Sequence, residues 1–481
     1  MFLYIIVIIS SIFAQNSSDK EYNINQEVVI TGQRTPYNSN NSLISLEIID
    51  SKEIENLGIQ SISDILEISS GIDVRNRGKS GMQSDVSIRG GSFNQTLILV
   101  DGIPVNDPQT GHHNMNLTIT PDMIERIEII KSGSSKSLGI NALTGAINLI
   151  TKNIKSNNIM LNIEGGDFKY KNAEITLIKK FNKFSNLISL STNSSNGFRP
   201  NTDHNYLNIA SKSNYNFNSF NKIALNLSYS DRQFGAFNFY TPSYPNQYEQ
   251  TKTLNASLIG EFGDTVRFSP SAFYRTNYDR FELFRDFKNA ASWYSDHNYH
   301  LSTIIGTNGN LSFSSIIGKS SIGYEIRNEN ILSTVLGEKL SNNISNPIDT
   351  TKFTKGKNRL NSTIFVENQY ESDNFLLNIG SSFFHNTDYG TYVNPGIDLG
   401  YRNENYKIYT NYNRSIRIPT FTELYYSGPT NIGNPDLKAE ISDNFEVGST
   451  YNKNKIQFNL SLFMRNGRNL IDWNRENDSL I

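Results

Sequence analysis

The sequence predicts a mainly β protein, in which an N-terminal α+β domain precedes a transmembrane antiparallel β-barrel. Segments beyond residue 157 alternate apolar and polar residues, which is typical of strands with one lipid-facing and one wet side. Short polar turns and longer loops rich in Asn, Ser and Tyr alternate between them. After residue 14, no apolar run approaches the ~18 residues of a transmembrane helix. A soluble β-sandwich or a β-solenoid is the alternative for such strands.

Composition excludes several classes of function. The formal net charge is −2 and the chain contains no basic block, which argues against nucleic-acid binding. The chain has no cysteine, so it offers no disulfide, thiolate nucleophile or Cys-ligated metal. No catalytic motif is present, so we predict neither an enzyme nor a bound cofactor.

The N-terminal residues contain two segments that precede the first domain. MFLYIIVIISSIFAQ is apolar, ends in small residues and is too short to span a bilayer, so we predict a signal peptide over residues 1–14. Residues 15–35 are polar except for a β-prone island, Val28 to Thr31, which stands alone. Such a strand can pair with another protein's sheet edge, or it is simply the first strand of the domain.

Residues 36–153 read as a compact α+β domain. Asp50, Glu53 and Gly58 predict a capped short helix, and Ser61 with Asp64 predicts the start of a second one. Strands are predicted at Val86–Arg89, Thr96–Val100, Glu125–Lys131 and Ala146–Thr151. The last of these is almost wholly apolar, so we expect it to be buried on both faces.

Residues 157–481 carry the predicted barrel strands. Ile223, Leu225, Leu227 and Tyr229 share one face, while Ser228 and Ser230 share the other. The segment from Ile456 to Leu462 repeats this pattern, and Asn182-Lys183 marks one tight turn.

Several ordered motifs resemble the TonB-dependent outer-membrane receptors, with cobalamin and siderophore receptors as the nearest subgroup. EVVIT at residues 27–31 resembles the TonB box; SIRGG, LVDGIPVN and IEIIKSGSSKSLGINALTGAINLITK resemble the plug; RIPTFTELYY, GNPDLKAE and NFEVG resemble barrel motifs. The resemblance implies a plug domain (residues 36–153) inside the barrel, in the outer membrane of a Gram-negative bacterium. It also implies active uptake of a scarce large solute such as a ferric siderophore or cobalamin. A passive porin or adhesin and a non-functional receptor fragment are the alternatives.

The resemblance assigns roles to individual residues. Glu27, Val28, Val29, Ile30 and Thr31 would pair as a strand with TonB, which the inner-membrane ExbB and ExbD motor energises. Arg89 and Lys131 of the plug and Glu446 of the barrel would form a latch between the two domains. Lys131 stands where the family has arginine, so the planar fork is lost there. The alternative is that all three are solvated charges in a wet lumen.

Ligand contacts are expected from two places, a plug loop and a barrel loop. The plug loop carries His112 and His113, but adjacent residues in a strand point opposite ways and no Asp, Glu or Cys completes a metal site, so we expect histidines at a loop tip without a metal role. The barrel loop carries aromatic residues that suit a large planar ligand or, alternatively, an interfacial belt: Phe237, Phe239, Tyr240 and Tyr244.

The length of the barrel segment departs from the family pattern. A barrel that holds a plug needs about 22 strands. Residues 157–481 provide room for only about 14 to 16, at about 10 membrane residues each. We therefore expect an incomplete barrel that lacks about six final strands and leaves two unpaired edges.

Overall fold

The computed structural model describes residues 29–30, 34, 37–38, 41–59, 61–78, 81–429, 431–453 and 456–474. The predicted signal peptide and Glu27, Val28 and Thr31 lie outside these ranges. Val29–Ile30 form β1, which pairs antiparallel with β2 (Tyr37–Asn38). The chain itself thus supplies a partner for these two residues, and the predicted pairing with TonB stays a prediction.

The N-terminal α+β domain, called the plug below, is built around a five-stranded sheet in the order β3-β8-β9-β6-β7. A separate pair, β4 and β5, packs beside it together with two short helices. The elements are β3 (Leu46–Asp50), α1 (Ser51–Leu57), α2 (Ile62–Glu67), β4 (Ile72–Asn76), β5 (Ser84–Ile88), η2 (Phe93–Gln95), β6 (Thr96–Val100), β7 (Ile103–Pro104), η3 (Gly111–His113), η4 (Pro121–Met123), β8 (Ile124–Ile130), α3 (Ser135–Leu138) and β9 (Gly145–Thr151).

Local sequence signals explain these plug elements. The carboxylate of Asp50 accepts a hydrogen bond from the Glu53 N–H at 2.8 Å and caps α1. Gly58 ends that helix at a φ of 60°, which glycine adopts without strain. Strand β9 lies in the middle of the sheet and is buried along almost its whole length, as its apolar sequence predicts. The turn from β6 to β7 has positive φ at both Asp101 (49°) and Gly102 (78°), as a tight hairpin requires.

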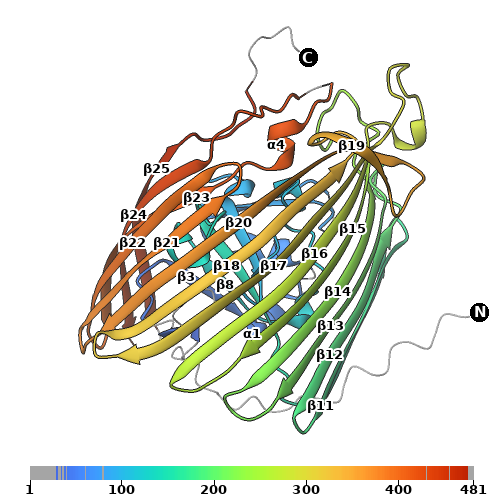
Figure 1. Cartoon of the computed structure of the whole chain (residues 1–481). Coiled ribbons are helices and arrows are strands. Elements are labelled where there is room, and N and C mark those ends of the chain that lie inside the picture. Colours follow the sequence, from blue (N-terminus) through green and yellow to red (C-terminus); the bar gives the residue numbers. More distant parts are fainter. Residues whose placement is uncertain are drawn as a thin grey trace, which may run out of the picture.

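A second, 16-stranded antiparallel sheet curves around the plug, and Figure 1 shows its long tilted strands. Its strands are β10 (Asn158–Gly166), β11 (Tyr170–Phe181), β12 (Phe184–Ser195), β13 (His204–Asn216), β14 (Lys222–Gly235), β15 (Tyr248–Glu261), β16 (Val266–Glu282), β17 (Asn298–Ser315), β18 (Gly318–Ser333), β19 (Glu338–Ser345), β20 (Lys352–Glu371), β21 (Phe375–Asn386), β22 (Gly390–Arg402), β23 (Tyr406–Arg417), β24 (Glu440–Lys453) and β25 (Ile456–Arg468). Two short helical turns, η5 (Arg285–Phe287) and α4 (Phe421–Tyr425), lie in the longer connections.

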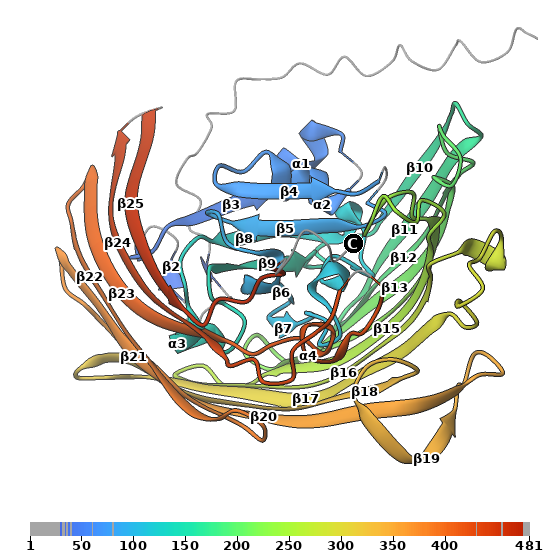
Figure 2. The same cartoon turned by 90° about the horizontal axis from the view of Figure 1, so that it is seen from above.

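This large sheet is open. Each strand pairs with its neighbour in the order β10 to β25, except that β19 pairs only with β20, and no pairing within the described ranges joins β25 to β10. Seen from above, the sheet forms a deep curve that holds the plug, with α1 and β4 in the gap between β25 and β10 (Figure 2). The number of strands agrees with the predicted 14 to 16.

The alternation of faces follows the prediction. Leu225 and Leu227 on β14 are 42% and 47% exposed and point away from the plug, whereas Ser230 is 1% exposed. Ser228 lies on the inner face and contacts Thr118 of the plug, 2.6 Å between the hydroxyl oxygens. An apolar outer face and a polar inner face are what a barrel in lipid needs. Among the described residues, no helix has the length and apolarity needed to cross a bilayer.

Candidate functional site

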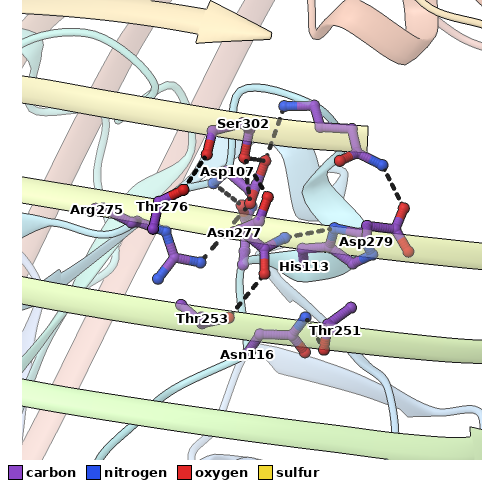
Figure 3. A network of polar contacts seen from close by, with 12 residues as sticks. Asp107, His113, Asn116, Thr251, Thr253, Arg275, Thr276, Asn277, Asp279 and Ser302 are labelled. Carbon is purple, nitrogen blue, oxygen red and sulfur yellow. Dashed lines mark hydrogen bonds and ion pairs between the residues drawn. The ribbon is translucent and has the colours of Figure 1, made fainter. Parts of the chain in front are cut away.

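The candidate site is the interface between the top of the plug and the inner face of the large sheet. Figure 3 shows its central network, in which polar side chains of the plug meet polar side chains of three adjacent strands, β15 to β17. Asp107 follows β7, and its carboxylate accepts hydrogen bonds from the Ser302 hydroxyl at 3.1 and 3.2 Å. Arg275 of β16 lies 3.8 Å from the same carboxylate. These buried polar contacts orient the plug against the barrel. Apolar contacts also join the two domains, such as Ile103 of the plug with Phe273 and Ile304 of the barrel.

The two neighbouring histidines lie in η3 and point in different directions. The hydroxyl of Thr110 accepts from the His112 N–H and caps this turn. His112 Nδ1 lies 2.7 Å from Asp85, inside the plug, while His113 Nε2 lies 3.0 Å from Glu249 of β15. His113 is only 2% exposed, so the expectation that it lies at a loop tip is wrong.

The environment of these side chains shifts their pKa values. Burial opposes the charged form of His113, but the hydrogen bond to Glu249 and the nearby carboxylates of Asp279 and Asp107 raise its pKa to about 9. Burial acts against the carboxylate of Asp85, yet the hydrogen bonds and charges of His112 and Arg77 leave its pKa below the usual value. Both groups therefore favour their charged forms at neutral pH.

Arg89 and Glu446 make the plug–barrel contact that the family motif implies. Arg89 Nη2 lies 3.2 Å from Glu446 Oε1, and both side chains are buried. The same nitrogen donates to the Ser461 hydroxyl at 2.8 Å, and the guanidinium lies 4.4 Å from the Phe463 ring centre. Arg89 itself has a φ of 49°, so the SIRGG turn aims this side chain toward β24 and β25.

The prediction that Lys131 forms part of the latch is wrong in this structure. Its ammonium pairs with Glu47, another plug residue, and lies 3.3 Å from the Ser70 hydroxyl. The reason is its place at the end of β8, directly beside β3 of the plug sheet. A second buried ion pair between plug and barrel is made instead by Lys136 of α3 with Asp398 of β22.

The four predicted aromatic ligand residues do not form one surface. Phe239 is 7% exposed and packs with Phe234 and Met82, so burial removes it from any ligand surface. Tyr240 is 37% exposed, and its hydroxyl donates to Glu249 at 2.6 Å. Phe237 lies beside Arg199, and Tyr244 packs edge-on against Phe284 and Trp293 in the outer loops.

Sequence reasoning missed a further set of plug–barrel contacts. Arg417, within RIPTFTELYY, forms buried ion pairs with Glu423 and Glu440. Those two carboxylates also accept from plug amides, Asn94 to Glu423 at 3.0 Å and Gln95 to Glu440 at 3.1 Å. The signal was present, because these charged residues lie within the motifs quoted above.

Comparisons with known proteins agree with this architecture. The family model "TonB-dependent Receptor Plug Domain" matches residues 38–146, and the model "TonB dependent receptor-like, beta-barrel" matches residues 177–480. A vitamin B12 transporter, BtuB of Vibrio vulnificus, is 23% identical over 94% of this chain and 72% of its own length. An iron-regulated outer membrane virulence protein of Vibrio cholerae is 26% identical over 92% and 68%.

Solved structures show the same fold. The unliganded ferric citrate transporter FecA has a TM-score of 0.72 at 15% identity, over 92% of this chain and 72% of that one. A ferric enterobactin receptor, a PfeA mutant of Pseudomonas aeruginosa, has a TM-score of 0.71 at 16% identity, over 92% and 73%. The matched models cover both domains, so this chain belongs to the TonB-dependent receptors, which are transport proteins of the Gram-negative outer membrane rather than enzymes.

Proposed function

We propose that this protein takes up a scarce, large solute of the cobalamin or ferric-siderophore class across the outer membrane, with energy delivered through TonB. The observation that carries the proposal is the way in which the plug is held inside the curved sheet. The plug fills the concave side of the sheet, yet several of its bonds to the barrel are ion pairs and hydrogen bonds, such as Arg89–Glu446 and Lys136–Asp398. Directional polar contacts hold one position and can be exchanged for water when the plug is pulled.

The strand β1 is the proposed point of attachment for TonB. Val29 and Ile30 already adopt extended backbone in an antiparallel pair with Tyr37 and Asn38. A strand of TonB would add to this backbone or take the place of β2. A pulling force on β1 would act on the plug from its N-terminal end.

The upper surface of the plug supports the proposed class of solute. Tyr240 lies edge-on to His112, 5.6 Å between ring centres, and His112 stacks on Phe93 at 4.5 Å. The guanidinium of Arg77 lies 5.6 Å from the Tyr240 ring. Aromatic rings beside a cation suit a large, partly planar, anionic chelate. A passive porin is not favoured, because the plug occupies the path that a porin needs open.

Uptake by intact cells tests the proposal. A host that lacks its own receptors would express the protein and receive labelled vitamin B12, ferric enterobactin or ferric citrate. The critical variant is Val29→Pro, which removes a backbone donor from β1, and the matched control is Val29→Ala. We expect accumulation of one of the three solutes, lost with Val29→Pro or without TonB and retained with Val29→Ala. Equal accumulation by both variants, at equal protein in the membrane, would contradict TonB energisation through β1.

A further inference from the structure

A cluster of three metal-ligating side chains lies between the plug and the barrel. His113 comes from η3 of the plug, Glu249 from β15 and Asp279 from β16. Their ligand atoms all lie within 4.8 Å of one another, and the three residues are buried. The strand register explains the meeting: Thr251 pairs with Asp279 and Glu249 with Phe281, so both carboxylates are on the inner face.

The distances suit a small cation. Ligand atoms around Zn²⁺ stand about 2.0 to 2.2 Å from the metal, so any two of them lie at most about 4 Å apart. The observed spread of up to 4.8 Å exceeds this limit by less than about 1 Å. Small side-chain rotations close that difference, because the three residues come from separate elements.

The donor set selects a class of metal. One imidazole nitrogen with two carboxylates suits a first-row divalent transition metal, whereas Ca²⁺ and Mg²⁺ prefer oxygen ligands alone. A neutral imidazole, two carboxylates and a divalent cation sum to zero charge, which is the least costly state for a buried cluster. The nearby Asp107 is faced by Arg275, so it adds little uncompensated charge.

A separate observation indicates that this cluster lacks a ligand. Asp279 is 3% exposed, and its Oδ2 accepts from Gln109 at 2.6 Å. Its Oδ1 is buried and has no hydrogen-bond partner among the described residues. A buried carboxylate oxygen without a partner is unfavourable, and a cation would satisfy it. Figure 3 shows Asp279 beside His113.

The surrounding residues fit the second shell of a metal site. The side-chain nitrogen of Asn277 lies 3.3 Å from His113 Nδ1. A flip of this amide places its oxygen to accept from the Nδ1–H of a neutral imidazole, which leaves Nε2 for the metal. Tyr240 donates to Glu249 Oε2, which leaves Oε1, the oxygen nearest His113, for the same metal. Each ligand is thus oriented by a neutral partner.

We propose that His113, Glu249 and Asp279 bind a first-row divalent transition metal that clamps the top of the plug to strands β15 and β16. The metal takes the place of the proton on His113, so its affinity rises with pH. Because Tyr240 connects Glu249 to the outer surface of the plug, the clamp lies directly beneath the proposed solute surface.

Zinc binding by the purified full chain in detergent tests this inference, and it needs neither solute nor TonB. The protein is stripped with a chelator, given Zn²⁺ in the presence of excess Mg²⁺, and its bound metal is measured by mass spectrometry and calorimetry. The test variants are His113→Gln and Asp279→Asn. The matched control is His300→Gln, a buried histidine of β17 that bonds Ser333. We expect one Zn²⁺ per chain in wild type and control, and binding at least about tenfold weaker in the test variants.

If a variant does not fold, X-ray absorption of zinc-loaded wild type identifies the type of ligands that bind the metal. The expected spectrum has nitrogen and oxygen ligands with scattering from one imidazole. Absence of zinc binding by wild type, absence of imidazole scattering, or equal binding by control and test variants would each overturn the inference. If the protein binds zinc but transports none of the three solutes, the metal site is supported and the proposed function is contradicted.

Discussion

The guanidinium carbon of Arg34 lies 3.8 Å from the ring centre of Phe365 on β20. Arg34 Nε also donates to the carbonyl of Ser137 in α3 at 2.8 Å, and the Ser321 hydroxyl donates to the carbonyl of Arg34 at 3.2 Å. Arg34 therefore touches plug and barrel at once, three residues after the predicted TonB box. A pull on that box reaches Arg34 before the plug sheet.

Replacing Arg34 by methionine should loosen this junction. The variant loses the hydrogen bond to Ser137 and a cation–π contact of about 1 to 2 kcal/mol. We expect faster hydrogen exchange in α3 (Ser135–Leu138), with unchanged exchange in β9. Arg34→Lys is the control, since it retains the charge without the planar guanidinium. Its exchange rate in α3 should lie between those of wild type and Arg34→Met. Exchange in α3 that stays at the wild-type rate would show that Arg34 does not anchor the segment.

The buried pair Arg89–Glu446 should behave as a coupled unit. Arg89→Met leaves Glu446 without its cation, and breaking a buried pair costs about 3 to 5 kcal/mol. The double variant Arg89→Met/Glu446→Gln should recover part of this loss. Plug stability, measured by denaturant dependence of hydrogen exchange in β5, gives the coupling energy. Strictly additive costs would show that the two residues act independently.

Plug stability should depend on acid through Asp85. Its pKa is lowered in the folded plug, so its contribution is present above the unfolded value of about 4 and is lost as the pH falls through the folded value. We expect proteolysis of the plug to accelerate below about pH 4 in wild type. Asp85→Asn should be less stable at neutral pH and show a weaker acid response. If Asp85→Asn responds to acid as wild type does, the loss of plug stability at low pH arises from other carboxylates.

Two glycines of the plug should respond differently to replacement by alanine. A Cβ at Gly145 would lie 2.2 Å from the Ile130 carbonyl oxygen, whereas a Cβ at Gly90 meets nothing within 4 Å. Gly90→Ala should therefore cost only the left-handed backbone penalty, about 1 to 2 kcal/mol. Gly145→Ala should separate β8 from β9 and abolish protection of their amides from exchange. Similar protection in both variants would contradict this close approach.

The sequence predicted those features that local chemistry determines. The caps of α1, strand β6 and the alternation on β14 each follow from neighbouring residues. Arg89 and Glu446 were paired through a family motif, and the structure shows the contact. Lys131 was misassigned because the motif gives a residue's place in the chain but not its neighbour, Glu47, across the plug sheet.

The cluster around His113 could not be predicted from the same information. Glu249 is 136 residues away in sequence, and its contact with His113 depends on how the plug is seated against β15. The alternation of residues along each strand indicates that Glu249 and Asp279 share the inner face, but only the register of β15 with β16 shows that they are near neighbours. Long-range register is set by the whole sheet, which no local pattern contains.

The pairing of β1 with β2 has a consequence for the affinity of any outside strand. A partner that needs the backbone edge covered by Tyr37 and Asn38 binds only the fraction of molecules in which this edge is free. Each 1.4 kcal/mol by which the internal pair is favoured lowers the apparent affinity about tenfold. Where the internal pair is favoured by about 1.4 kcal/mol or less, a small change elsewhere in the plug is enough to shift the population toward the state in which the proposed TonB strand would bind.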